Sequence, residues 1–276
     1  MKRFLPLACL VLPAYAQMVT PDWLQKERLD PKVVILDARL PEEYAKGHLP
    51  GALLVNAYDN LVDSSPEGEK VFHQWLVDTF SKLGLNSSED RVIVYETRLG
   101  MRAARAFWML WYAGQHKVGM LQGGFEAWKQ SGMLVSTDPP PPRTPTKYKL
   151  RPQKKYMATA TEMAALAKDK KTVILDVRTR EEHEGKSGSS DCARQGNIPG
   201  SVWVEWTEFL SPDRSTLQNP EKLGLLLLEK GVTPDKQIVT YCHRGARAAM
   251  VWAALDELGY PKIKNYIGSW HDWASK

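Results

Sequence analysis

The chain has 276 residues, of which 43% are hydrophobic and 25% are charged, and its formal net charge is +5 at pH 7. This length can bury full hydrophobic cores and favours two domains over one. The 37 Lys and Arg residues are spread along the chain, which argues against a nucleic-acid-binding protein, and three cysteines are too few for a disulfide framework.

The N-terminus has the pattern of a secretory signal peptide. Lys2 and Arg3 precede an apolar stretch over residues 4–12, and small residues end at Ala16, where we expect cleavage. The apolar stretch is too short to span a bilayer, and no later one is long enough. We therefore predict that residues 1–16 are removed and that the mature chain is periplasmic or secreted, without membrane attachment. Two cysteines and a net charge of +3, from 35 basic and 32 acidic residues, would remain.

An internal repeat organises the rest of the chain. Four segments recur in the same order: residues 33–39 at 172–178, 47–52 at 196–201, 92–95 at 237–241 and 123–128 at 268–273. The period is far too long for a solenoid, so each copy should be a self-contained domain.

Each copy alternates short apolar β-branched runs with helical patterns, which we expect at residues 70–83, 101–113, 220–230 and 248–258. This alternation predicts an α/β fold in which each domain is a parallel sheet with helices on both faces. A proline-rich segment at residues 136–150 predicts a semi-rigid linker. We expect an N-terminal domain over residues 17–135 and a C-terminal domain over 151–276.

Polar residues near the expected strand ends in both copies favour structural roles. Asp37 with Arg39, and Asp176 with Arg178, recur in the two copies, which favours an ion pair or loop brace over catalysis. His48 belongs to a turn motif and should be a hydrogen-bonded loop residue.

Cys242 is the predicted nucleophile. It ends a β-branched run and is followed by a tight loop with Gly245 and by an Ala-rich helix, so we expect an exposed thiol at a helix N-terminus. Helix N-terminal N–H groups, with Arg244 and Arg247, favour both a thiolate and an anionic substrate. Backbone N–H groups over residues 243–247, including those of His243, Gly245 and Ala246, should cradle the anion.

Residues 241–247 resemble the active-site loop of the rhodanese family, sulfurtransferases that carry a persulfide on cysteine. Residues 44–52 and 268–273 are similar to two further signatures of the family, and the resemblance to its tandem-domain members covers nearly the whole mature chain. It implies that the N-terminal domain, with Glu96 at the nucleophile position, is non-catalytic and walls the cleft of the catalytic C-terminal domain.

The resemblance implies transfer of sulfur from a small anionic donor to a thiol or cyanide, through a Cys242 persulfide and without a cofactor, and we expect a monomer. Arg244 favours thiosulfate, because 3-mercaptopyruvate enzymes of the family tend to have Ser there. One position departs from the family: Glu182 stands where a donor-binding arginine is usual, and Arg180 or Arg194 could replace that arginine.

Other interpretations stay open at this point. A cysteine phosphatase needs Cys-x5-Arg, but Arg247 comes one position too early; a non-catalytic partner-binding pair of domains does not explain Cys242 between charges. Four histidines show no ligand spacing along the chain, so we predict no metal: His73, His116, His183 and His271. Cys192 lies in a Gly- and Ser-rich insertion at residues 185–195, and we expect either an unrelated loop thiol or an accessible thiol that resolves the persulfide or pairs with Cys242.

Overall fold

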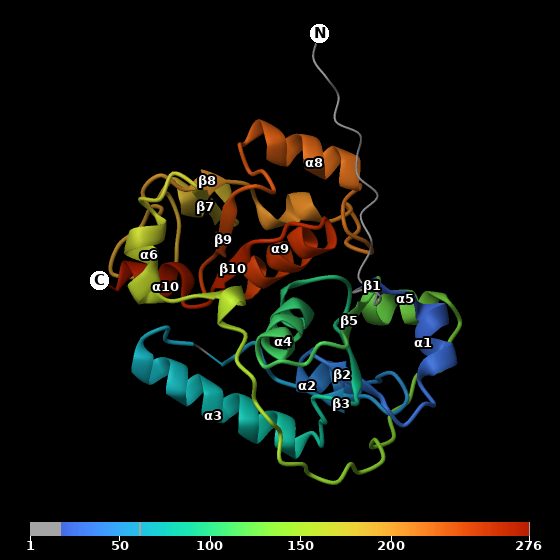
Figure 1. Ribbon diagram of the computed structural model, residues 1–276. Coiled ribbons are helices and arrows are strands. Elements are labelled where there is room, and N and C mark those ends of the chain that lie inside the picture. The colour runs from blue at the N-terminus through green and yellow to red at the C-terminus, as the bar shows by residue number, and fades with distance from the viewer. Residues whose placement is uncertain (1–17, 61, 276) are drawn as a thin grey trace.

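The computed structural model describes residues 18–60 and 62–275, so the predicted signal peptide lies outside the described part of the chain. Within that part, each repeat forms its own five-stranded, all-parallel sheet. Figure 1 shows the two halves stacked on each other, with the N-terminal half in blue to green and the C-terminal half in yellow to red. The predicted α/β fold with two parallel-sheet domains is confirmed.

The first sheet has the strand order β1-β5-β4-β2-β3. Its elements are β1 (Met18–Val19), α1 (Pro21–Glu27), β2 (Val33–Asp37), α2 (Pro41–Ala45), β3 (Leu53–Leu54), α3 (Pro66–Lys82), β4 (Arg91–Tyr95), α4 (Met101–Tyr112), β5 (Val118–Leu121) and α5 (Gly124–Gln130). Successive residues of β2 point to opposite faces, and both faces are buried: Val34 and Leu36 lie in a core with α3 and α4, and Ile35 lies in a core with α1 and α5.

The second sheet repeats this order as β6-β10-β9-β7-β8. Its elements are β6 (Met157–Ala158), α6 (Ala160–Leu166), β7 (Thr172–Asp176), α7 (Arg180–His183), β8 (Val202–Trp203), α8 (Pro220–Glu229), β9 (Gln237–Tyr241), α9 (Ala246–Glu257), β10 (Ile263–Tyr266) and α10 (Ser269–Ala274), with short 3₁₀ turns at Lys154–Tyr156 and Trp206–Phe209. The register also repeats, since Asp37 pairs with Tyr95 and Asp176 with Tyr241. The duplication seen in the sequence is therefore a duplication of the fold.

The predicted helices form with small shifts at their N-termini. α3 begins four residues earlier than predicted because Ser65 caps it, accepting a hydrogen bond from the Gly68 N–H, and Pro66 occupies the first turn. α9 begins at Ala246, immediately after Gly245 in the left-handed conformation.

The two halves share one hydrophobic core. α4 packs against α9, and Phe107 of α4 lies 6.4 Å from the Trp252 ring of α9, which also meets Tyr156 at 5.2 Å. Residues 139–153 form no helix or strand and run along the N-terminal half, where the Thr146 N–H donates to the Ser81 carbonyl at 3.0 Å. The sheets are thus held in a fixed relation by a packed interface.

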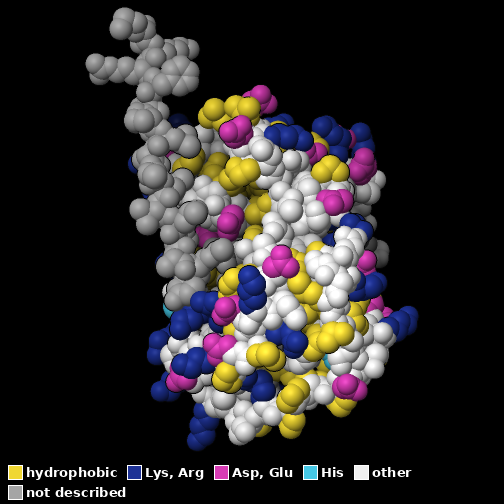
Figure 2. Space-filling model, turned by 90° about the vertical axis from the view of Figure 1, so that its right-hand side faces the viewer, with side chains coloured by type: hydrophobic (Ala, Val, Ile, Leu, Met, Phe, Trp, Pro, Cys, Tyr) yellow, Lys and Arg dark blue, Asp and Glu magenta, His cyan; other side chains and the backbone are white. Residues whose placement is uncertain are grey.

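The surface carries mixed charge. On the face shown in Figure 2, basic and acidic side chains are interspersed and form no single-sign patch. None of the helices in residues 18–60 and 62–275 is long and apolar enough to cross a bilayer.

Candidate active site

The loop after β9 places the Cys242 sulfur at the N-terminus of α9. The Gly245 N–H donates to Sγ at 3.1 Å, so a helix N-terminal amide already points at the sulfur. Cys242 is only 1% exposed and lines a cavity, which corrects the expectation of an exposed thiol.

Gly245 is required by the geometry of this loop. Its φ is +82°, a conformation that L side chains rarely adopt, and a Cβ atom there would lie 2.5 Å from the carbonyl oxygen of Ile267. The close approach allows Asn265 of β10 to donate to the Gly245 carbonyl at 3.1 Å.

The C-terminal motif holds the loop from behind. The Cys242 N–H donates to Ser269 Oγ at 3.2 Å, and the Trp270 N–H donates to the Cys242 carbonyl at 2.9 Å. The His271 N–H makes the next contact, to the His243 carbonyl at 3.0 Å. These bonds explain why residues 268–273 accompany the cysteine loop in the sequence.

Cys242 opens into a cavity of about 510 Å³ between the two halves. The C-terminal half contributes Trp206, Cys242, His243, Arg244, Ala246 and Arg247, and the N-terminal half contributes Tyr58, Asp59, Met101 and Arg105. The N-terminal half therefore forms one wall of the cavity, as the resemblance implied.

Arg105 is a cavity residue that the sequence pattern did not predict. This α4 residue is buried; it donates to the Ala57 carbonyl at 3.0 Å and to the carbonyls of Asn60 and Arg244. Burial lowers its pKa to about 10, whereas the charge of Cys242 acts to raise it. The available signal was an arginine in the middle of an Ala-rich apolar helix, where a charge needs a partner.

The two arginines of the cysteine loop each have a carboxylate partner. Arg244 pairs with Asp191 of the insertion, and Arg247 makes a two-pronged ion pair with Glu182 of α7, at 2.6 and 2.8 Å. Burial acts to raise the pKa of Glu182, but the hydrogen bonds and charge of Arg247 outweigh it and lower that pKa to about 2. Glu182, at the position where the family usually has an arginine, is thus the counter-ion of a cavity arginine.

The other proposed donor-binding arginines lie outside the cavity lining. Arg180 pairs with Glu184 at 3.4 Å and lies over the Trp203 ring, and Arg194 donates to the Trp273 carbonyl at 2.8 Å. Neither replaces the missing arginine in this structure.

Cys192 is buried, so of the two alternatives for this residue the structure disfavours the accessible thiol. Its Sγ lies 3.9 Å from His243 Nδ1, and it packs in the core on the α6 and α10 face of the sheet, whereas Cys242 belongs to the core on the α8 and α9 face. Both cysteines are free thiols in the structure.

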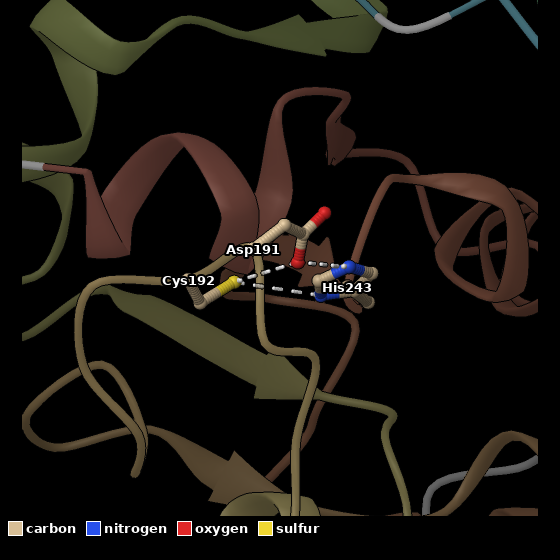
Figure 3. A group of neighbouring side chains, drawn as sticks. All are labelled: Asp191, Cys192 and His243. Atoms are coloured by element: carbon tan, nitrogen blue, oxygen red, sulfur yellow. Dashed lines mark hydrogen bonds and ion pairs between the residues drawn. The ribbon is translucent and has the colours of Figure 1, made fainter.

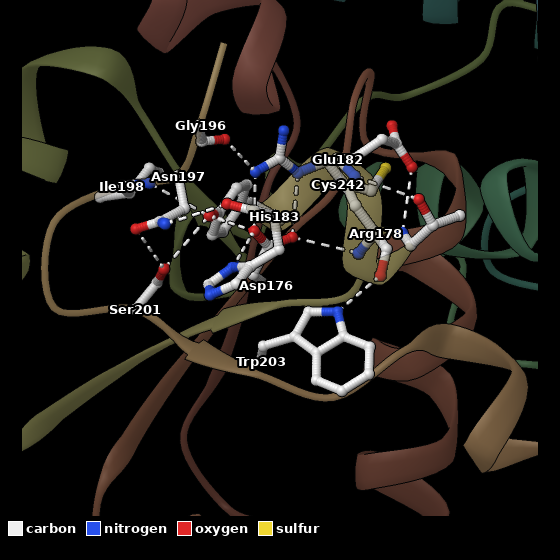
Figure 4. A network of polar contacts seen from close by, with 12 residues as sticks. Asp176, Arg178, Glu182, His183, Gly196, Asn197, Ile198, Ser201, Trp203 and Cys242 are labelled. Atoms are coloured by element: carbon white, nitrogen blue, oxygen red, sulfur yellow. Dashed lines mark hydrogen bonds and ion pairs between the residues drawn. The ribbon is translucent and has the colours of Figure 1, made fainter. Parts of the chain in front are cut away.

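The Asp-x-Arg pairs are structural, as predicted. Arg178 Nη2 donates to Asp176 Oδ2 at 2.7 Å and to the Gly196 carbonyl at 2.7 Å (Figure 4). The Tyr241 hydroxyl donates to the same carboxylate at 2.6 Å. The first half contains the same network, formed by Asp37, Arg39, Gly47 and Tyr95. His48 is a hydrogen-bonded loop residue, with its ring nitrogens 3.0 Å from the carbonyls of Tyr44 and Asp138.

Glu96 occupies in the first half the place that Cys242 occupies in the second. Its Oε1 accepts hydrogen bonds from the N–H groups of Arg102 and Ala103, at 3.0 and 3.2 Å, at the start of α4. Burial raises the pKa of Glu96 to about 7. The first loop therefore holds a carboxyl group where the second holds a sulfur.

Comparison with known proteins agrees with this architecture. A rhodanese-like domain model matches residues 20–131 and 159–276. Similar proteins include the sulfur carrier protein TtuD of Thermus thermophilus (30% identical, covering 94% of this chain and 93% of that protein) and a thiosulfate sulfurtransferase of Azotobacter vinelandii (31%, 94% and 94%). A 3-mercaptopyruvate sulfurtransferase of Escherichia coli is 29% identical, covering 94% of this chain and 95% of that protein.

Among solved structures, an anaerobic ergothioneine biosynthesis enzyme from Chlorobium limicola superposes with a TM-score of 0.84 at 20% identity, covering 94% of this chain and 68% of that chain. That likeness concerns the fold alone. The two matched domains, the parallel sheets and the relatives at about 30% identity confirm the predicted family: this chain belongs to the rhodanese family, with two rhodanese-like domains in tandem.

Proposed function

We propose that this chain is a thiosulfate sulfurtransferase that carries sulfur on Cys242. The observation that carries the proposal is the position of the Cys242 sulfur, which accepts the Gly245 N–H at the start of α9 inside a cavity lined by three arginines. Relatives named thiosulfate sulfurtransferase support the same activity.

The reaction proceeds in two half-reactions. The Cys242 thiolate attacks the outer sulfur of thiosulfate, the S–S bond breaks, and sulfite leaves with the bonding electron pair. A nucleophilic acceptor, cyanide or a thiolate, then attacks the outer sulfur of the persulfide. The sulfur–sulfur bond of the persulfide breaks, and the Cys242 thiolate is restored.

The cavity stabilises the charges of both steps. Arg244, Arg247 and Arg105 line the cavity into which Cys242 opens, and the Gly245 N–H at the start of α9 points at the sulfur. Arg244 is the best placed for the donor, because its side chain is 42% exposed, whereas those of Arg247 and Arg105 are largely buried.

A second donor, 3-mercaptopyruvate, is favoured by one observation. Asp191 and Glu182 neutralise Arg244 and Arg247, so the cavity offers less positive charge to a donor. This loss weakens the binding of thiosulfate, a dianion, more than that of 3-mercaptopyruvate, a monoanion. A relative at 29% identity is named for this donor.

Steady-state kinetics with cyanide as acceptor test the assignment. We expect thiocyanate formation from thiosulfate with a higher kcat/KM than from 3-mercaptopyruvate, and no turnover in Cys242→Ser. A higher kcat/KM with 3-mercaptopyruvate would make that compound the donor instead of thiosulfate. Turnover in the Cys242→Ser variant would overturn the persulfide mechanism.

We also propose export, with cleavage after Ala16. The support is the charged start, the apolar stretch and the small residues before that position. N-terminal sequencing of the protein recovered from its native cell should start at Gln17; an intact N-terminus would contradict export.

A further inference from the structure

Three side chains with metal-binding atoms meet beside the cysteine loop. Figure 3 shows Asp191, Cys192 and His243 facing one another, and their ligand atoms all lie within 4.8 Å of one another. Cys192 Sγ is 3.6 Å from Asp191 Oδ1 and 3.9 Å from His243 Nδ1, and His243 Nε2 is 3.5 Å from Asp191 Oδ1. Spacing along the chain gave no hint of this group, because 51 residues separate Cys192 from His243.

A fourth group comes from α10. His271 Nε2 lies 3.8 Å from Asp191 Oδ2, and its ring stands perpendicular to that of His243 at a centroid distance of 6.1 Å. The cluster thus joins the insertion, the active-site loop and the C-terminal helix.

The distances suit a tetrahedral ion. Zn²⁺ binds sulfur at about 2.3 Å and nitrogen or oxygen at about 2.0–2.2 Å, so neighbouring ligand atoms of a tetrahedral site lie roughly 3.3–3.8 Å apart. With one ligand atom taken from each residue, Asp191, Cys192 and His243 lie within 4.8 Å of one another, so modest side-chain movements would bring these atoms to tetrahedral separations. Asp191 and His271 are 31% and 39% exposed, which gives an ion an entry path.

The chemistry of the cluster also suits a divalent cation. Asp191 supplies a carboxylate, and Cys192 would bind the ion as a thiolate while its proton leaves to solvent. Moreover, His243 Nε2 is buried and makes no hydrogen bond within residues 18–60 and 62–275.

We propose that this cluster is a Zn²⁺ site beside the Cys242 loop, with three protein ligands, Asp191, Cys192 and His243, and with His271 next to them. Asp191 faces Cys192 and His243 with Oδ1 and faces Arg244 with Oδ2, so one carboxylate oxygen can bind the ion while the other keeps its ion pair. The site goes beyond the proposed sulfur transfer, and its consequence is structural: the ion ties the insertion to the active-site loop.

Spectroscopy with Co²⁺ as a substitute for Zn²⁺ tests the site without an activity assay. The experiment uses the Cys242→Ser variant, so that Cys192 is the cysteine available within the described residues. We expect one Co²⁺ per chain, a thiolate-to-cobalt charge-transfer band and the intense visible bands of a tetrahedral ion. Zn²⁺ should displace the Co²⁺ and abolish these bands. Calorimetry in two buffers should show one proton released per Zn²⁺.

Matched variants in the same background identify the ligands. Cys192→Ser should remove the charge-transfer band, and His243→Gln should weaken Zn²⁺ binding by at least about tenfold, the loss that even an outer-shell change causes. His116→Gln, next to Trp111 and away from the cluster, should leave binding unchanged. Circular dichroism checks that each variant is folded. A charge-transfer band that persists in folded Cys192→Ser, or the absence of any band before that change, would overturn the proposal.

Discussion

Among single residues, the three arginines that line the Cys242 cavity already interact with carboxylate or carbonyl oxygens of the protein. Arg244 has Asp191, Arg247 has Glu182, and Arg105 has three backbone carbonyls. An anionic donor must therefore compete for Arg244, whose side chain is the most exposed of the three cavity arginines. We therefore expect the preference between thiosulfate and 3-mercaptopyruvate to depend on the Arg244 side chain.

Replacing Arg244 with Ser should lower kcat/KM for thiosulfate by roughly ten- to a hundredfold, because a hydrogen bond to a charged group contributes about 1.5–3 kcal/mol. Relative activity with 3-mercaptopyruvate should rise. Steady-state assays with both donors check this, and Arg194→Ser, outside the cavity, serves as the control. An unchanged ratio between the donors would mean that Arg244 does not select them.

Glu96 makes the stability of the protein depend on pH. Its folded-state pKa of about 7 lies above the ordinary value of 4.5, so the folded state holds a proton that the unfolded state has lost between these pH values. Stability should fall as pH rises from about 4.5 to about 7, by on the order of 3 kcal/mol. Denaturant unfolding at several pH values should show this slope in the wild type and not in Glu96→Gln. Glu89→Gln, a change at an exposed residue, is the control and should keep the slope. If the pH dependence of stability persists in Glu96→Gln, another group causes it.

At the scale of elements, the site is a strand, a four-residue loop and a helix, supported by the C-terminal motif. β10 and the residues after it approach the loop so closely that a side chain at position 245 would collide with the Ile267 backbone. The sulfur is positioned by this close packing of backbone segments.

Gly245→Ala should therefore cost both stability and activity. Backbone strain alone costs about 1–3 kcal/mol, and the contact with the Ile267 carbonyl adds to it by moving the loop. Gly200→Ala is a matched control, since Gly200 has a φ of +79° and a Cβ atom at that position would meet nothing within 4 Å. Thermal unfolding and kcat should both fall further for Gly245→Ala; equal effects of the two changes would show that crowding at the loop is unimportant.

The sequence predicted these elements because their signals are local. The β-branched run before Cys242, Gly245 and the Ala-rich helix lie within about twenty residues, and the repeat fixed their counterparts in the first half. Contacts between distant segments were not predictable: Arg105 reaches Arg244 across 139 residues, and Asp191 comes from an insertion without a counterpart. Burial of Cys242 and Cys192 was missed for the same reason.

At the scale of the whole molecule, the two rhodanese-like domains are joined by a common interior. One hydrophobic core contains Val34 and Leu36 of β2 as well as Ile238 of β9, with α4 and α9 between the sheets. Because the cavity lies between the halves, loss of this packing would also open the site.

We therefore expect the two halves to unfold together, in one transition with equal calorimetric and van't Hoff enthalpies. Trp252→Ala should lower the stability of the whole protein by about 3–5 kcal/mol. Exposed Leu225→Ala should have little effect. Differential scanning calorimetry checks this, and two separate transitions in the wild type would contradict a shared core.

Mass spectrometry of the donor-treated protein shows whether Cys242 carries the transferred sulfur. After incubation with thiosulfate and no acceptor, the wild type should gain about 32 Da, and peptide mapping should assign the added sulfur to Cys242. Cyanide should remove it, and Cys192→Ser should behave as the wild type does. An added sulfur in Cys242→Ser, or an unmodified wild type that still turns over, would show that Cys242 is not the sulfur carrier.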